Sequence, residues 1–179
     1  DLSETYLLKF AKLIREFFEL SEKRDIPIAR EVKLLDNYMA LEKMRFEEKL
    51  TYSIIADENL NQETNTVPSM LLQPLVENAI NHGIFHKESL GHVSVEFKLI
   101  DDRSYGVTIC DDGIGRENSR KLKAKSIQGH LSKSTQIFTE RVELLNRTHR
   151  WNITYTITDL TKDSKNPGTC IHITIKHND

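Results

Sequence analysis

The segment Leu71–Gly83 constrains the fold of this 179-residue chain more than any other stretch of it. Its apolar residues recur at steps of three and four and share one face of a helix, namely Leu72, Leu75, Val76, Ala79 and Ile80. The opposite face carries Pro74, Glu77, Asn78, Asn81 and His82. Such a helix covers a core with one face and gathers polar side chains on the other.

The polar side of this helix has two interpretations. A face that meets only water is the ordinary outcome for an amphipathic helix. Lys and Glu usually fill such a face, whereas Asn78 and Asn81 are poor helix formers. Their carboxamide groups become useful if they meet a hard cation and phosphate oxygens, so the composition favours a binding site.

Periodicity elsewhere predicts helices and strands without a regular βαβ rhythm. We expect helices at about 1–22, 29–49, 69–82 and 136–148, with Gly83 ending the third. We expect strands at about 50–56, 92–100, 105–111, 152–159 and 169–177. The stretch 113–135 reads as a long loop with a short helix. This pattern favours an α+β fold, a two-layer sandwich with helices on one face of a mixed, mostly antiparallel sheet.

A second signal is the apolar strand Tyr105–Asp111, which runs into Asp111-x-Gly113-x-Gly115. A carboxyl group at the end of a buried strand needs a hydrogen-bond donor, and an adenine amino group is one candidate. The two glycines would let the backbone approach a flat ring. A simple Asp-Gly turn between strands is the alternative. No Gly-Lys-Ser/Thr follows, so this is not a Walker loop.

Composition excludes some classes of function. The formal net charge is -2, and Lys and Glu are interleaved, so the basic face of a nucleic-acid binder is missing. Cys110 and Cys170 lie far apart in apolar runs, and we expect both to be reduced core residues of a cytosolic protein. No stretch approaches the roughly 20 apolar residues of a membrane helix. The chain opens on Asp1 without Met, so we expect a piece of a longer protein, and a membrane-bound parent stays open.

Three segments, in this order, resemble the ATP-binding domain shared by histidine kinases, gyrase-type topoisomerases, Hsp90 chaperones and MutL proteins. Glu77–Gly83 looks like the N box, Asp111-x-Gly113-x-Gly115 like the first glycine box, and Gly168-Thr169 like the closing Gly-Thr strand. Four flanking runs are similar to the LytS-type branch of sensor histidine kinases: Leu13-Ile14-Arg15, Tyr38–Glu42, Arg45-Phe46 and Glu140–Asn146.

The resemblance implies a Bergerat-type ATP-binding fold at 25–179. A preceding segment, 1–24, would be the second helix of a dimerisation hairpin. Within the N box, Asn78 would bind Mg²⁺ through its side-chain oxygen, and Asn81 and His82 would face the phosphates of ATP. Glu77 would be the catalytic base or water-positioning acid.

The resemblance also assigns the adenine end. Asp111 would accept a hydrogen bond from the adenine amino group, and Gly113 and Gly115 would shape the pocket. Thr169 would support Asp111 or a bridging water. Residues 114–134 would form the ATP lid.

One residue departs from the family pattern. The family presents a glycine just before the helix that carries Glu140 and Arg141, and Ser134 stands there instead. The hydroxyl groups of Ser132 and Ser134, with the amides at the helix start, are candidates for binding phosphate. With Ser134 in place of this glycine, the sequence is also compatible with a weaker affinity for the nucleotide.

The implied reaction transfers the γ-phosphoryl group of ATP to a histidine nitrogen, for relay to the receiver domain of a response regulator. The family's acceptor segment, of the type His-Phe-Leu-Phe-Asn, does not occur in the sequence. We therefore expect a fragment that binds ATP and Mg²⁺ without autophosphorylating alone. The full-length protein implied is a homodimeric bacterial sensor at the inner membrane, and this chain would be a cytoplasmic portion of it.

Three alternatives stay open at this point. A degenerate docking module of the same fold is favoured by Ser134. Another ATPase of the superfamily, from a chaperone or a mismatch-repair protein, would suit Glu77. An anti-sigma-factor serine kinase would lack the two opening helices. The flanks around Leu13 and Arg45 argue against the last two.

Overall fold

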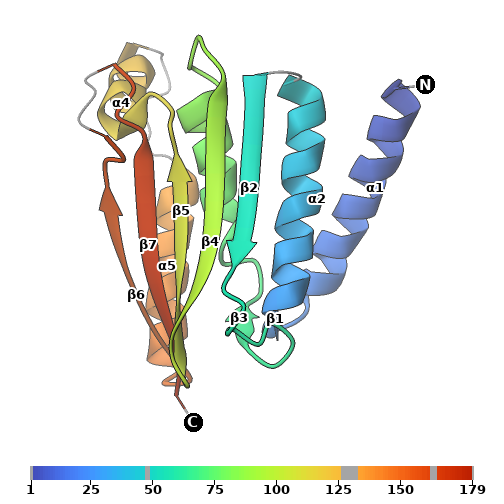
Figure 1. Ribbon diagram of the computed structural model, residues 1–179, viewed down its shortest axis with the longest axis vertical. Coiled ribbons are helices and arrows are strands. Elements are labelled where there is room, and N and C mark those ends of the chain that lie inside the picture. Colours follow the sequence, from blue (N-terminus) through green and yellow to red (C-terminus); the bar gives the residue numbers. More distant parts are fainter. Residues whose placement is uncertain (1, 47–48, 126–132, 162–164, 179) are drawn as a thin grey trace.

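The computed structural model describes residues 2–46, 49–125, 133–161 and 165–178 (Figure 1). Its centre is a five-stranded sheet in the order β2 (Leu50–Ala56), β4 (Gly91–Asp101), β5 (Ser104–Asp111), β7 (Thr169–His177) and β6 (Trp151–Thr158). β2 runs parallel to β4, and the other three pairs are antiparallel. The predicted α+β fold with a mixed, mostly antiparallel sheet is confirmed.

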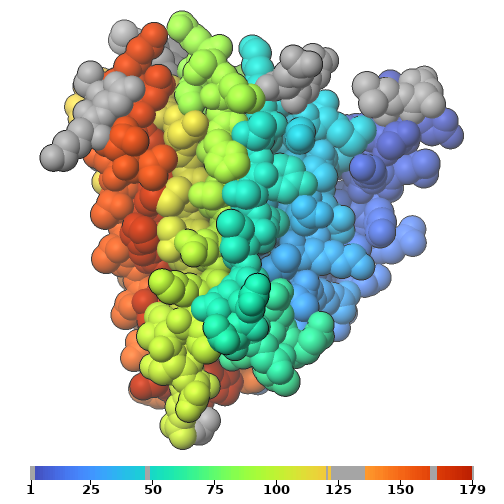
Figure 2. All heavy atoms as spheres, in the orientation of Figure 1, coloured from blue at the N-terminus to red at the C-terminus, as the bar shows by residue number. Residues whose placement is uncertain are grey.

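The helices lie on one side of this sheet. They are α1 (Leu2–Ser21), α2 (Ile28–Phe46), α3 (Gln73–Asn78), the π-helix η2 (Ala79–Ile84), α4 (Gly115–Lys125) and α5 (Lys133–Arg147). In Figure 1, α3, η2 and α5 lie behind the sheet, and α2 and α1 follow one another beyond β2. The space-filling view in Figure 2 shows the other face of the sheet without a helix in front of it.

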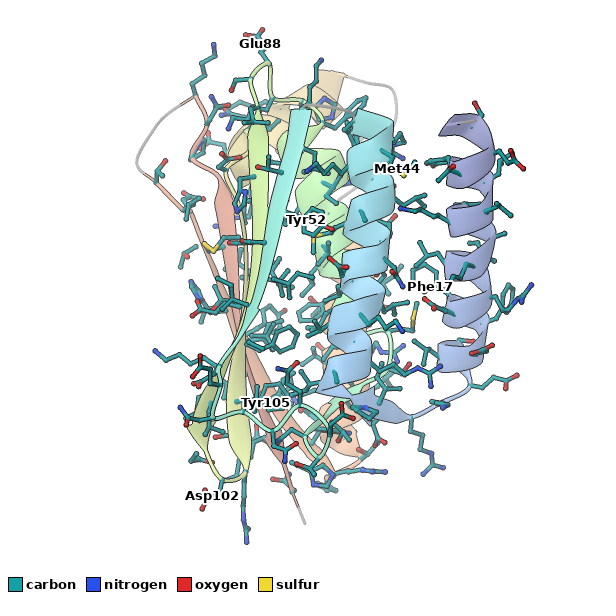
Figure 3. All side chains as sticks on the ribbon, turned by 45° about the vertical axis from the view of Figure 1, so that its right-hand side comes forward. Phe17, Met44, Tyr52, Glu88, Asp102 and Tyr105 are labelled. Atoms are coloured by element: carbon teal, nitrogen blue, oxygen red, sulfur yellow. A yellow bond between two sulfur atoms is a disulfide. The ribbon has the colours of Figure 1, made fainter. Side chains whose placement is uncertain are left out.

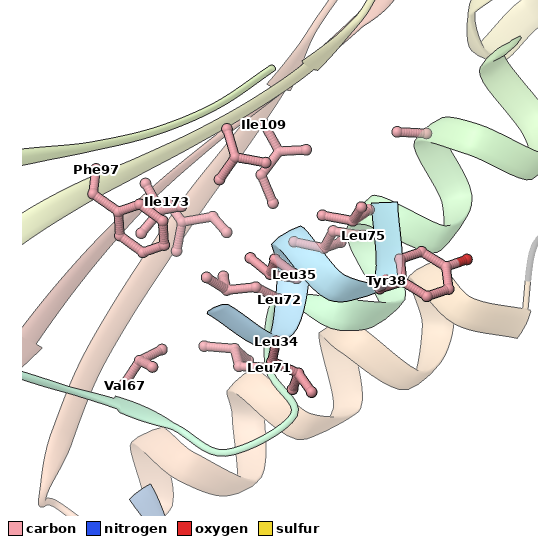
Figure 4. Packing of buried hydrophobic residues seen from close by; sticks show 14 of the residues in the cluster. Leu34, Leu35, Tyr38, Val67, Leu71, Leu72, Leu75, Phe97, Ile109 and Ile173 are labelled. Carbon is pink, nitrogen blue, oxygen red and sulfur yellow. The ribbon is translucent and has the colours of Figure 1, made fainter. Parts of the chain in front are cut away.

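The core lies between the sheet and the helices (Figure 4). Phe97, Ile109 and Ile173 point from the sheet toward Leu35 of α2 and Leu72 at the start of α3, and each is at most 2% exposed. Burying a side chain of this size contributes roughly 1.5–3 kcal/mol. The apolar face predicted for the segment after Leu71 is therefore one wall of this core.

A small second sheet was not predicted. β1 (Asp25–Pro27) pairs antiparallel with β3 (Thr66–Pro68), which places Ile26 opposite Val67, and both are fully or almost fully buried. Each strand has three residues and contains a proline, so neither carries a periodic pattern. The helices and strands expected from the sequence left both segments unassigned.

One side of α1 packs against α2. Leu13 and Leu20 are buried, and the Ser69 hydroxyl donates to the Leu20 carbonyl at 2.6 Å. Figure 3 shows α1 outside α2, with Phe17 turned into the gap between them. Leu8 and Phe18 stay 66% and 72% exposed. Within the part of the chain that the structure covers, no helix has both the length and the apolar character to cross a bilayer.

The two cysteines correct a prediction. Cys110 of β5 and Cys170 of β7 are register partners, and a disulfide joins them. They alternate with the buried Ile109 and Ile173 and so lie on the sheet face away from the helices. The expectation of two reduced core residues is wrong because 60 residues separate the pair, and only the β5–β7 register brings them together.

Candidate functional site

The three segments singled out in the sequence meet at one end of the sheet, where β5 ends and β7 begins beside α4 (Figure 1). Asp111 is the direct cross-strand partner of Thr169. The Gly168 amide donates to the Gly113 carbonyl at 3.0 Å, and the Ile114 amide donates to the Gly83 carbonyl at 3.2 Å. Backbone hydrogen bonds thus join the N-box helix, the first glycine box and the start of the last strand.

We call this junction the glycine corner and define it as Gly83, Asp111, Gly113, Gly168 and Thr169. A Cβ atom on Gly113 would overlap the backbone of Gly83, and one on Gly83 would overlap the Asp111 carboxylate. Both positions therefore require glycine because two backbones and a carboxylate share one small space.

The helix end at Gly83 differs from the prediction. The π-helix η2 runs through Gly83 to Ile84, and the Phe85 amide donates back to the Ile80 carbonyl at 2.9 Å. Gly83 is therefore not a C-terminal stop. Its missing side chain serves the contact with Asp111, which a sequence pattern does not report. A π-turn inside a helix is rare and often accompanies a functional site.

Asp111 is the chemically unusual group of the glycine corner. It is 6% exposed, and its Oδ1 accepts the Gly113 amide at 3.0 Å. Burial raises its pKa to about 7, against the Gly113 hydrogen bond, which lowers it; Asp112 adds to the rise and Lys87 opposes it. A carboxyl group so poorly solvated is ready to accept a hydrogen bond from a ligand donor.

The polar face of the N-box helix, Glu77, Asn78, Asn81 and His82, lies as periodicity predicts. Glu77 is exposed and the other three are partly exposed. Pro74 occupies the first turn of α3, where a proline costs no hydrogen bond. The polar face and the glycine corner are consecutive along one helical segment, from Glu77 to Gly83.

Two residues of α2 reach this polar face. Arg45 Nη2 donates to Asn81 Oδ1 at 3.0 Å and lies 2.7 Å from Glu42 Oε2. The sequence interpretation used both residues only as family flanks and gave them no role. Arg45 and Asn81 are 36 residues apart in the sequence, and their contact depends on how α2 packs, so the sequence did not reveal it.

A buried carboxylate and a partly buried arginine lie near the start of the N-box segment. Glu31 of α2 is fully buried, and its charge interacts with Arg141 of α5, which donates to the Ser69 carbonyl. Burial raises the Glu31 pKa to about 7, and Arg141 opposes the rise. Arg141 thus ties α5 to the backbone just before α3, so the helix that carries the polar face is held at its start.

Comparison with known proteins agrees with this geometry. A sequence profile of the histidine kinase family matches residues 1–50. The sensor histidine kinase YpdA of Escherichia coli is 29% identical over 157 residues, 87% of this chain and 25% of that protein. The sensor protein LytS of Streptococcus agalactiae is 31% identical over 117 residues, 64% of this chain and 19% of that protein.

The chain is similar in sequence to sensor histidine kinases, including one named LytS. It spans a quarter or less of the length of these relatives. The mycobacterial sensor histidine kinase MprB shares the fold, with a TM-score of 0.55 and 17% identity over 86% of this chain and 97% of that one. The predicted resemblance is confirmed.

Only some of the residues assigned to the ATP lid lie in the described part of the chain. α4 occupies Gly115–Lys125, and Gly115 begins it with a φ of 74°. Ser132 lies outside the described residues. Ser134 lies in the first turn of α5, which starts at Lys133 and not near Gln136 as predicted. The backbone of Ser134 is therefore at a helix N-terminus.

Proposed function

We propose that this chain binds ATP with Mg²⁺ and supplies the catalytic domain of a LytS-type sensor histidine kinase. The observation that carries the proposal is the glycine corner, where a buried Asp111 faces Thr169 and where Gly83 and Gly113 touch backbone to backbone. This junction offers one poorly solvated acceptor and no bulky side chain, which suits a flat base with an amino group.

At the adenine end, Asp111 would accept the hydrogen bond of the amino group. Gly113 and Gly115 would line the ring, and Thr169 would support Asp111 from the neighbouring strand. Because the Asp111 carboxyl is already held through Oδ1 by the Gly113 amide, its orientation is set before a ligand arrives.

At the phosphate end, side chains of the polar face would bind Mg²⁺ and the phosphates. Asn78 offers a carboxamide oxygen, a hard donor that suits Mg²⁺, and Mg²⁺ usually takes few protein ligands together with phosphate oxygens and water. The cation would neutralise charge that develops on the phosphates. Asn81 and His82 would donate to phosphate oxygens, and Ser134 would add a donor from the start of α5.

The reaction would be phosphoryl transfer to a histidine nitrogen. The nitrogen lone pair forms a bond to the γ-phosphorus while the bond to the β–γ bridging oxygen breaks, and ADP leaves with that electron pair. Glu77, exposed on the polar face, would position or deprotonate the incoming group. The protein's part is positioning and charge neutralisation.

The acceptor histidine would belong to another part of the full-length protein. Residues 1–24 would be the second helix of the dimerisation hairpin and 25–179 the catalytic domain. The phosphoryl group would pass on to a response regulator, and the complete sensor would be a homodimer anchored at the inner membrane. We accordingly expect no label on the isolated chain after incubation with γ-phosphate-labelled ATP.

The decisive experiment is calorimetric titration with Mg²⁺ and AMPPNP, an unhydrolysable ATP analogue, against the chain and its Asp111→Asn variant. We expect binding that the variant loses. Asp101→Asn is the matched control, because Asp101 also accepts the amide two residues on, from Arg103 at 2.9 Å, but at the far end of the β4–β5 hairpin. Binding that survives Asp111→Asn would contradict the assigned adenine site. Absence of binding with the fold intact would favour a degenerate docking module.

A further inference from the structure

Arg45 brings a positive charge to the polar face from another helix. It lies one residue before the end of α2 at Phe46, and its Nη2 donates to Asn81 Oδ1 at 3.0 Å. Asn81 is one helical turn along from Glu77 and Asn78. The guanidinium group therefore lies over the row of side chains proposed to meet Mg²⁺ and phosphate.

A buried carboxylate holds this guanidinium in place. Glu42 Oε2 lies 2.7 Å from Arg45 Nη2, and the Glu42 side chain is 7% exposed whereas that of Arg45 is 45% exposed. The guanidinium carbon also lies 4.5 Å from the centre of the Phe46 ring. A fixed partner lies beneath Arg45, and nearly half of the side chain still faces solvent.

An ordinary surface ion pair does not account for this arrangement. Exposed pairs of the i,i+3 type contribute little to stability, about 0–1 kcal/mol. Here the carboxylate is withdrawn into the protein, where its ionised form is costly, while the arginine extends to the N-box helix. Both contacts use the same Nη2 atom of a group with five N–H donors.

The negative charges around the polar face favour a positively charged side chain beside the phosphates. Glu42 interacts electrostatically with both Glu77 and Arg45, so two carboxylates lie close to the proposed path of the phosphates. Asn78 and Asn81 are neutral. A nucleotide phosphate chain would meet repulsion from the two carboxylates unless a positive charge offset it.

We infer that Arg45 binds the phosphate chain of the nucleotide, with Glu42 as its positioning residue; this inference rests on the proposed function. When the nucleotide enters, the phosphate oxygens take donors of the guanidinium, and Glu42 keeps it in place from beneath. A guanidinium fork suits phosphate oxygens better than the compact ammonium of lysine.

The test compares two ligands on the 179-residue chain by calorimetry: AMPPNP with Mg²⁺, and adenosine, which has no phosphate. The variants are Arg45→Gln, Arg45→Lys and the control Arg30→Gln. Arg30 lies on the same helix, is 40% exposed and pairs with Glu19 at 3.4 Å, away from the N box. Asp111→Asn is run beside them as the probe of the adenine end.

We expect Arg45→Gln to weaken AMPPNP binding about 10- to 100-fold, the range for losing a charge-assisted hydrogen bond, and to leave adenosine binding unchanged. Arg45→Lys should recover part of the loss, and Arg30→Gln should match the parent.

Three outcomes would overturn the inference. AMPPNP binding unchanged in Arg45→Gln, while Asp111→Asn abolishes it, would show that the site is real and that Arg45 does not touch phosphate. Equal loss of AMPPNP and adenosine would assign Arg45 a structural role. A parent chain that binds neither ligand would remove the proposed function itself, and the inference with it.

Discussion

The two ends of the proposed site are built in opposite ways. At the glycine corner, backbone atoms meet backbone atoms, and the one important side chain, Asp111, is 6% exposed. At the polar face, side chains make the site, and Glu77 and Arg45 are exposed. One end is part of the packed sheet, and the other is a set of polar groups on its rim.

The difference separates stability from ligand binding. Substitutions at the glycine corner should lower both the stability of the fold and the affinity for the ligand, because the same atoms contribute to both. Changes at the polar face should affect the ligand alone, since exposed polar groups contribute little to folding. Four predictions test this division, in order of decreasing effect on the free energy of unfolding.

Reduction of the Cys110–Cys170 disulfide should have the largest effect. The bond closes a loop of 60 residues and lies next to Asp111 and Thr169. Its loss should lower the free energy of unfolding by about 2–4 kcal/mol. Urea titrations with and without a reductant measure this, and the Cys110→Ser and Cys170→Ser double variant should be insensitive to the reductant. Identical curves for the parent in both conditions would contradict the prediction.

Gly113→Ala should destabilise the chain by about 3 kcal/mol, the upper range for overpacking, because the new methyl group meets the Gly83 backbone and not a side chain that could turn away. AMPPNP binding should disappear as well. Gly106→Ala is the control, since the nearest atom to its Cβ would be at an ordinary 3.7 Å. Equal stability of the two variants would remove the distinction between the two ends.

The Asp111 carboxyl should make stability depend on pH. Its pKa rises from 3.8 to about 7 on folding, so the folded chain holds the proton more tightly than the unfolded chain. This stabilising contribution is complete below about pH 4 and is lost as pH rises toward 7. Asp111→Asn removes the dependence, whereas Glu31, whose pKa is also raised by burial, stays in both proteins.

The measurement is the difference in unfolding free energy between Asp111→Asn and the parent. It should grow in favour of the variant by about 3 kcal/mol across this pH window, because the Asp111 pKa differs by about three units between the folded and unfolded chain and each tenfold difference in proton affinity corresponds to about 1.4 kcal/mol. A difference that stays constant with pH would mean that the Asp111 pKa is ordinary and that the glycine corner is better solvated than its burial indicates.

Asn81→Ala should have the smallest effect on folding. Asn81 is partly exposed and accepts one hydrogen bond from the exposed Arg45, so the free energy of unfolding should change by less than about 0.5 kcal/mol. AMPPNP affinity should fall nevertheless. Thermal unfolding and calorimetry on the same sample give both values, and a large loss of stability would contradict the view of the polar face as a rim.

Much of the fold could be predicted because it rests on local patterns. The alternation in β5 and β7 and the three-four spacing in α1 and α2 marked these elements within a few residues. The β1–β3 sheet could not be predicted because three-residue strands have no period. The disulfide could not be predicted because it follows from strand register, a property of two distant segments taken together.

The site divides in the same way. Asp111 and Asn78 belong to motifs that can be recognised in the sequence alone. Gly83 was interpreted as a helix stop because the group that excludes a side chain there, the Asp111 carboxylate, belongs to a distant strand and only the folded chain brings the two together. Arg45 lacked a role for the same reason, since its contact with Asn81 crosses from one helix to another.

The place of β7 in the sheet has a consequence for how the chain is made. β7 follows the other four strands of the sheet along the chain, yet it lies between β5 and β6 in the interior of the sheet. Until it arrives, β5 has an open edge, β6 has no neighbour, and Gly168 and Thr169 are absent from the junction with Gly113. The proposed nucleotide site is therefore incomplete until Thr169 has been synthesised, and a nascent chain stalled before Thr169 would be exposed to strand-pairing errors.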